Sequence, residues 1–133
     1  MKLLKDIIYG IRIVEIKGNT NIAIESIAFD SRRINNLSLF IAVNGVSQNG
    51  HNFISDAESN GACAIICNEL PENLKENITY IKVLNSSESL GIVASNFYDN
   101  PSEKLKLIGI TGTNGKTTCA TLLYDLYRLM GYK

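Results

Sequence analysis

Histidine and cysteine are scarce in this sequence: there is one histidine, His51, and there are three cysteines. A structural zinc site draws nearly all of its ligands from these two residue types, so the composition argues against one. Cys63 and Cys67 lie in the apolar run ACAIIC, which is typical of a buried strand. We therefore expect these two cysteines to act as small core residues.

Long apolar runs are also absent. No segment approaches the length of a membrane span, and the first residues, MKLLKDIIYG, are interrupted by Lys5 and Asp6, unlike a signal peptide. An odd number of cysteines without an export signal is typical of a reduced compartment. We expect a cytoplasmic protein that does not bind a membrane.

Runs of basic residues are missing as well, which argues against a DNA- or RNA-binding protein. The formal net charge is zero, but it is unevenly distributed: residues 1–101 carry 8 basic and 11 acidic residues, and residues 102–133 carry 5 and 2. A small positive region fits a nucleoside triphosphate better than a long nucleic acid. The apolar content of 45% over 133 residues predicts a packed core.

Short apolar runs alternate with helix-like segments along the chain, which predicts an α/β fold with a mixed, partly parallel sheet. The expected helices cover residues 3–9, 53–60 and 87–98 and a last one from Lys116 onward. The expected extended segments cover residues 11–17, 22–29, 39–43, 62–67, 79–84 and 105–110.

A domain boundary is expected in YDNPSEK, residues 98–104, because Asn-Pro ends a helix and a new strand follows. Residues 1–100 would form one domain, and residues 101–133 would begin a second with a single strand–loop–helix unit. One such unit cannot bury both faces of a parallel strand. We therefore expect a truncated second domain, and no catalysis by this chain alone.

The segment GITGTNGKTT, residues 109–118, joins the expected strand at 105–110 to the last helix. The general phosphate-loop pattern asks for a glycine at position 110, where the sequence has Ile110. The setting is nevertheless suitable, because backbone N–H groups at a helix N-terminus attract phosphate. Lys116 would supply a charge to the phosphates and Thr117 a hydroxyl to Mg²⁺. The alternative is an ordinary glycine-rich turn before a helix.

Several ordered motifs resemble the Mur ligase family. GITGTNGKTT resembles the ATP loop of that family, whose glycine falls at the position of Gly112 and so accounts for the mismatch. The segment AFDSRRINNLSLFIAVNGVSQNGHNFISDAESNGACAII resembles the N-terminal uridine-nucleotide domain of the members that add the third residue of the peptidoglycan stem peptide. FYDNPSEKLKLIGITGTNGKTT resembles their interdomain junction.

This resemblance implies an ATP- and Mg²⁺-dependent ligase. Its substrates would be UDP-N-acetylmuramoyl-L-alanyl-D-glutamate and an amino-acid acceptor, either meso-diaminopimelate or L-lysine, joined through an acyl phosphate. Two alternatives remain: the family member that adds D-Ala-D-Ala, and a stand-alone module that binds a nucleotide or UDP-sugar. The lone strand–helix unit also predicts self-association through exposed apolar faces.

The resemblance also implies two sets of site residues. Lys116 would be catalytic and would bind ATP, Thr117 would hold Mg²⁺ through ATP, and the other ATP contacts would be Gly112, Thr113, Asn114, Gly115 and Thr118. The UDP contacts would be Phe29, Ser31, Val46, Ser47 and Gln48, with Arg32 and His51 as further candidates.

Each of the UDP contacts has a structural alternative. Phe29 could belong to the core, Ser31 could cap a turn with Asp30, and residues 46–48 could be only a surface loop. Arg32 and His51 could hold the domain together through hydrogen bonds.

Overall fold

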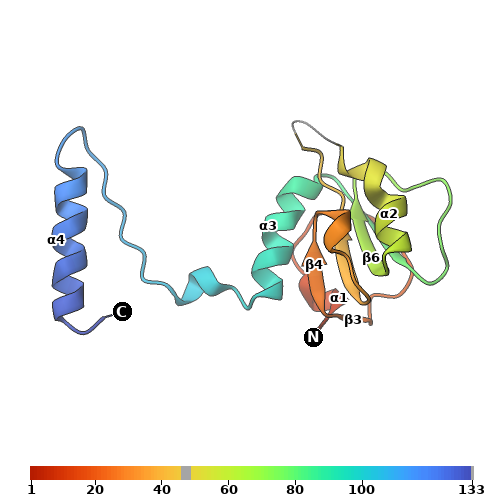
Figure 1. The fold of residues 1–133 in the computed structure, drawn as a ribbon, viewed down its shortest axis with the longest axis horizontal. Helices are drawn as coiled ribbons and strands as arrows, with labels where there is room; N and C mark the ends of the chain where they lie inside the picture. The colour runs from red at the N-terminus through yellow and green to blue at the C-terminus, as the bar shows by residue number, and fades with distance from the viewer. Residues whose placement is uncertain (46–48, 133) are drawn as a thin grey trace. The chain divides into compact units, whose positions relative to one another are not determined.

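The computed structural model describes residues 1–45 and 49–132 (Figure 1). The chain divides into two compact units, Met1–Ser102 and Glu103–Lys133. Val46, Ser47 and Gln48, three of the expected UDP contacts, lie outside the described residues. No helix in the described part of the chain is long and apolar enough to cross a membrane.

The first unit contains a five-stranded sheet in the order β2-β7-β6-β5-β4. Its strands are β2 (Ile13–Lys17), β4 (Ser26–Ala28), β5 (Ser38–Ile41), β6 (Ala62–Cys67) and β7 (Thr79–Val83). The strands β4 to β7 run parallel, and β2 pairs antiparallel with β7 at one edge. The predicted α/β fold with a partly parallel sheet is therefore confirmed. A separate pair is formed by β1 (Lys2–Leu3) and β3 (Ala23–Ile24).

Helices cover both faces of this sheet. The helices α1 (Leu4–Ile7) and α3 (Ser86–Phe97) pack on one face, and α2 (Ile54–Ser59) packs on the other (Figure 1). Side chains of a strand alternate between faces, so Leu39 and Ile41 join the α1/α3 side whereas Phe40 joins the α2 side. The central strands are apolar on both faces for this reason.

The carboxyl ends of the parallel strands lie along one edge of the sheet, and the segments that follow them meet there. The short 3₁₀ turn η1 (Ser31–Arg33) comes after β4, and η2 (Gly50–Phe53) comes soon after β5. Asn68 follows β6 directly, and Asn85 caps α3 after β7. In parallel α/β sheets, ligands bind at this edge.

The second unit holds one long helix, α4 (Lys116–Leu129), and the end of the short turn η3 (Pro101–Lys104). The prediction of a strand at Leu105–Ile110 is wrong, because these residues have no regular secondary structure. A strand is stabilised by hydrogen bonds to a neighbouring strand, and none of the described strands pairs with this segment. None of the described residues from 103 to 132 is buried.

Candidate functional site

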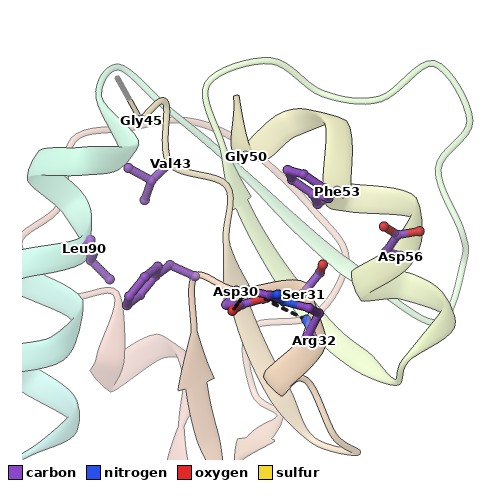
Figure 2. A pocket seen from close by; sticks show the side chains of 10 residues that line it. Asp30, Ser31, Arg32, Val43, Gly45, Gly50, Phe53, Asp56 and Leu90 are labelled. Atoms are coloured by element: carbon purple, nitrogen blue, oxygen red, sulfur yellow. Dashed lines mark hydrogen bonds and ion pairs between the residues drawn. The ribbon is translucent and has the colours of Figure 1, made fainter. Parts of the chain in front are cut away.

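An open pocket of about 690 Å³ lies in the first unit at the carboxyl edge of the sheet. Four parts of the chain contribute to it: residues 29–32 after β4, residues between β5 and η2, η2 with the start of α2, and α3 (Figure 2). The lining residues are Phe29, Asp30, Ser31, Arg32, Val43, Gly45, Gly50, Phe53, Asp56 and Leu90. The expected contacts Phe29, Ser31 and Arg32 are thus brought together in one cavity.

Phe29 is the aromatic residue that immediately follows β4. It is 66% exposed and lines the pocket, so the alternative that it belongs to the core is wrong. An exposed phenyl ring retains apolar surface in contact with water, which a flat ring of a ligand can cover by stacking. Phe29 therefore provides a stacking surface at the pocket.

Ser31 begins the turn η1, and only 7% of its surface is exposed. Its backbone oxygen accepts a hydrogen bond from Asn60 Nδ2 at 2.9 Å. Its hydroxyl has no hydrogen-bond partner among the described residues. The cap of the turn is Asp30, whose Oδ1 accepts from the N–H of Arg32 at 3.1 Å. The alternative that Ser31 caps a turn is therefore wrong, and its hydroxyl is available to a ligand.

Asp30 and Arg32 form a two-pronged ion pair beside Ser31 (Figure 2). Arg32 Nε donates to Asp30 Oδ1 at 2.9 Å, and Arg32 Nη2 donates to Asp30 Oδ2 at 2.8 Å. These hydrogen bonds from Arg32 lower the pKa of Asp30 to about 2. The Arg32 side chain remains 87% exposed, so the pair orients the guanidinium at the pocket without burying it.

Gly50 lies in close backbone contact with Val43 at the pocket wall. Its N–H donates to Val43 O at 2.9 Å, and a Cβ on Gly50 would lie 2.6 Å from both the N and the O of Val43. Only glycine fits such an approach without a backbone shift. Gly50 thus brings the start of η2 directly against Val43.

His51, the neighbour of Gly50, does not line the pocket. Its ring nitrogens bond to Asn44, Asn49 and the backbone of Asn68, and burial lowers its pKa. The structure therefore gives His51 the contacts of a residue that holds segments together, one of the two interpretations that the sequence left open.

The other pocket residues were not predicted as site residues from the sequence: Asp30, Val43, Gly45, Gly50, Phe53, Asp56 and Leu90. Val43 and Leu90 lie on one side of the pocket in Figure 2, and Phe53 and Asp56 lie on the other. Phe53 belongs to a motif that the sequence displays, so its position after Gly50 and His51 was a usable signal. Leu90 lies in α3, and no local pattern connects that helix with residues 29–50.

The second unit contains the expected phosphate loop at the start of α4. Gly115 precedes the helix with φ of 78°, and Gly112 has φ of 150°, two conformations that favour glycine. The N–H groups of Lys116, Thr117 and Thr118 have no partner among the described residues, because the first helical hydrogen bond runs from Cys119 N to Gly115 O. Three free donors therefore point out of the helix start.

Lys116 lies over this loop. Its Nζ donates to Gly112 O at 2.5 Å and is 3.5 Å from Thr113 O. The Thr117 hydroxyl makes no hydrogen bond within the described residues. Free N–H groups, an ammonium group and a free hydroxyl are the donor set that a nucleoside triphosphate with Mg²⁺ requires, so the residues present fit these ligands.

Comparison with known proteins decides the family. The family model described as "Mur ligase family, catalytic domain" matches residues 23–98. The chain belongs to the Mur ligase family. This Mur ligase chain is 53% identical over 131 residues to the UDP-N-acetylmuramoyl-L-alanyl-D-glutamate–2,6-diaminopimelate ligase of Cytophaga hutchinsonii and 49% identical over 130 residues to that of Bacteroides fragilis. Each alignment covers 98% of the Mur ligase chain and 27% of the relative, so the chain spans about a quarter of the relatives' length.

Solved structures of Mur ligases resemble the chain in fold. The MurF ligase of Thermotoga maritima in complex with ADP is 30% identical, with a TM-score of 0.52 over 77% of this Mur ligase chain and 23% of that protein. The UDP-N-acetylmuramoylalanyl-D-glutamyl-2,6-diaminopimelate–D-alanyl-D-alanyl ligase of Acinetobacter baumannii is 28% identical, with a TM-score of 0.53 over 71% and 20%.

Proposed function

We propose that this chain is the part of an ATP-dependent ligase that holds the UDP end of its substrate and begins its ATP site. The substrate is UDP-N-acetylmuramoyl-L-alanyl-D-glutamate, and the acceptor is diaminopimelate, as in the names of the relatives. The observation that carries the proposal is that one pocket holds the exposed Phe29 ring and the Ser31 hydroxyl, which no described residue engages in a hydrogen bond. The UDP-linked substrate and ATP assign the reaction to the cytoplasm.

Recognition of the uridine end follows from the chemistry of these two residues. A uracil ring is flat and can cover the exposed face of Phe29, which removes apolar surface from water. Its edge carries carbonyl oxygens and an N–H, and the Ser31 hydroxyl can donate to or accept from them. The Arg32 guanidinium, already oriented by Asp30, lines the same pocket and is free on its outer side to meet the diphosphate.

The loop before α4 is the proposed ATP site. Lys116 and the free N–H groups of the helix start neutralise and position the phosphates, with Gly112, Thr113, Asn114 and Gly115 forming the curved backbone around them. Thr117 would hold Mg²⁺, which, when bound with ATP, supplies positive charge to the phosphate oxygens. The ADP-bound Thermotoga maritima relative supports nucleotide binding in this family.

The proposed reaction has two steps. A carboxylate oxygen of the dipeptide attacks the γ-phosphorus of ATP; a P–O bond forms, and the bond to ADP breaks. The acceptor amine then attacks the acyl carbon; the amide bond forms, phosphate leaves, and the amine loses a proton. In the first step Lys116 and the N–H groups hold the transferring phosphate while its charge redistributes.

Titration of UDP into the full chain tests the uridine site. Ser31→Ala should raise the dissociation constant by roughly two- to tenfold, which corresponds to the loss of one hydrogen bond. Ser102→Ala is the matched control, because Ser102 is exposed and does not line the pocket, and it should leave the affinity unchanged. Equal affinity in the Ser31→Ala protein and the wild type would contradict the proposed contact.

The sequence leaves two other functions open. Addition of D-Ala-D-Ala is the reaction in the name of one structural relative, but that relative is 28% identical, compared with 53% for a diaminopimelate ligase. A stand-alone nucleotide-binding module would bind UDP with the same pocket. Ligase assays of the full-length gene product with diaminopimelate, lysine and D-Ala-D-Ala as acceptors distinguish all three.

A further inference from the structure

His51 makes hydrogen bonds with both of its ring nitrogens. Nδ1 lies 3.0 Å from Asn44 Oδ1 and 2.9 Å from Asn49 Oδ1, and Nε2 accepts from the N–H of Asn68 at 2.9 Å. Because a backbone N–H can only donate, Nε2 carries no proton, and the proton of the neutral ring is on Nδ1. The ring therefore ties Asn44 and Asn49, which lie between β5 and η2, to Asn68 at the end of β6.

Asn68 extends this chain of contacts to α3. Its Oδ1 accepts from Ser86 Oγ at 2.6 Å, and its Nδ2 donates to Leu84 O at 2.9 Å. Ser86 is the first residue of α3 and is 1% exposed. One asparagine thus connects the ends of β6 and β7 with the start of the helix, and its own N–H fixes His51.

The two ends of this chain of contacts belong to walls of the same pocket. Val43, Gly45 and Gly50 lie next to Asn44, Asn49 and His51, and Leu90 lies one turn beyond Ser86 on α3 (Figure 2). The hydrogen bonds through His51 and Asn68 therefore link Asn44 and Asn49, which lie between β5 and η2, to the start of α3. Neither His51 nor Asn68 lines the pocket.

We propose that Asn68 and His51 are positioning residues that hold residues 43–45 and 49–50 in place relative to α3 and so set the shape of the pocket. This inference rests on the proposed function for its effect on UDP, but its structural part can be measured without a ligand. Asn68 is fixed by α3 and in turn orients His51, which holds the Asn44 and Asn49 side chains.

Protonation of His51 would break this arrangement. A proton on Nε2 would face the N–H of Asn68, so one donor would oppose another. Burial lowers the pKa of His51 from 6.5, and the carboxylate of Glu69 raises it to a smaller extent. The unfolded chain consequently binds more protons than the folded chain just below pH 6.5. The folded state, in which His51 accepts from Asn68, therefore loses stability as the pH falls below 6.5.

Hydrogen exchange of the Gly50 amide, which donates to Val43 O, is the measurement that does not depend on a ligand. Asn68→Ala should lower the protection factor of this amide by roughly two- to tenfold, the value of one or two hydrogen bonds. Asn73→Ala, at an exposed asparagine outside this set of contacts, is the control. UDP affinity should fall by a similar factor in Asn68→Ala and should stay unchanged in Asn73→Ala.

His51→Gln separates positioning from general folding. A glutamine oxygen can accept from the N–H of Asn68 but does not titrate, so protection of Gly50 should be the same at about pH 7.5 and about pH 5.5. In the wild type it should fall at the lower pH, and UDP affinity should fall with it. This variant keeps the test valid even if Asn68→Ala does not fold.

The outcomes are distinct. Equal Gly50 protection in the wild type, Asn68→Ala and His51→Gln proteins at both pH values would overturn the positioning inference, whatever UDP does. Loss of protection in Asn68→Ala, with no UDP binding to the wild type, would support the positioning and refute the proposed uridine site.

Discussion

The two units of this chain build their binding features in opposite ways. The pocket of the first unit collects residues as far apart as Phe29 and Leu90 and depends on a sheet covered on both faces. The proposed phosphate loop of the second unit is a run of consecutive residues before a helix whose side chains are not buried. The pocket therefore depends on tertiary packing, whereas the loop depends on local backbone conformation.

The largest effect should come from the core of the first unit. Ile66 is fully buried, and Ile66→Ala should lower the free energy of unfolding by about 2–5 kcal/mol because it leaves a cavity. Leu126→Ala in α4, at a side chain that is 50% exposed, should change it by less than about 0.5 kcal/mol. Urea unfolding followed by circular dichroism measures both.

A large cost for Leu126→Ala would break the comparison, since it would show that α4 buries this face in solution. Self-association stays a prediction from the exposed apolar residues of α4. Light scattering over a concentration series tests it, and a monomer at every concentration would contradict it.

Lys116→Ala should have the next largest effect, on the second unit. The ammonium group would hold ATP phosphates through charge-assisted hydrogen bonds, so its loss should weaken ATP binding by roughly ten- to a hundredfold. Lys106→Ala, at an exposed lysine outside the loop, should leave the affinity nearly unchanged. Fluorescence titration with an ATP analogue in the presence of Mg²⁺ is the measurement, and equal losses in both variants would point to general charge attraction.

Gly50→Ala tests how tightly the pocket wall is packed. The new Cβ would lie 2.6 Å from Val43 backbone atoms, so the variant should lose about 1–3 kcal/mol of unfolding free energy and bind UDP more weakly. Gly91→Ala is the matched control, because nothing lies within 4 Å of a Cβ there and the site is helical, so it should gain up to about 1 kcal/mol. Thermal unfolding of the two variants measures the difference between their unfolding free energies. No difference would show that the backbone around Val43 and Gly50 can shift to accept a methyl group.

The smallest effect should come from the Asp30–Arg32 pair. The pKa of Asp30 is lowered from 3.8 to about 2, so the unfolded state binds more protons between these values and stability falls as the pH drops through them. The pair is exposed, and solvent screens most of its contribution. Carboxyl NMR titration should show the pKa of Asp30 rising toward 3.8 in Arg32→Ala and much less in Arg33→Ala. An unchanged pKa in Arg32→Ala would show that the hydrogen bonds from Arg32 do not cause the lowered pKa.

Local patterns predicted some elements well and failed at one for a clear reason. The run ACAIIC predicted β6 with its observed ends, Ala62–Cys67, because β-branched and small apolar residues fit a strand buried on both faces. The same reasoning predicted a strand at Leu105–Ile110, which is not formed. Propensity selects an extended backbone, but a strand also needs a hydrogen-bonding neighbour.

Residues that a motif places close together in the sequence also lie together in the pocket, although their contacts with a ligand stay a prediction. Phe29, Ser31 and Arg32 were all expected and all line it, because η1 follows β4 directly. Leu90 and Asn68 were not expected. Their relation to residues 43–51 arises only when β5, β6 and β7 pair and bring their carboxyl ends to one edge.

The sequence by itself determined the glycine-rich turn before α4, the alternation of strands and helices, and the residues of η1, because each depends on neighbours within a few positions. Only the tertiary structure decided that Phe29 is exposed, that the Ser31 hydroxyl has no partner within the described part of the chain, and that His51 connects through Asn68 to α3. Burial and hydrogen-bond partners are properties of contacts between distant segments, and those contacts form only when the sheet assembles.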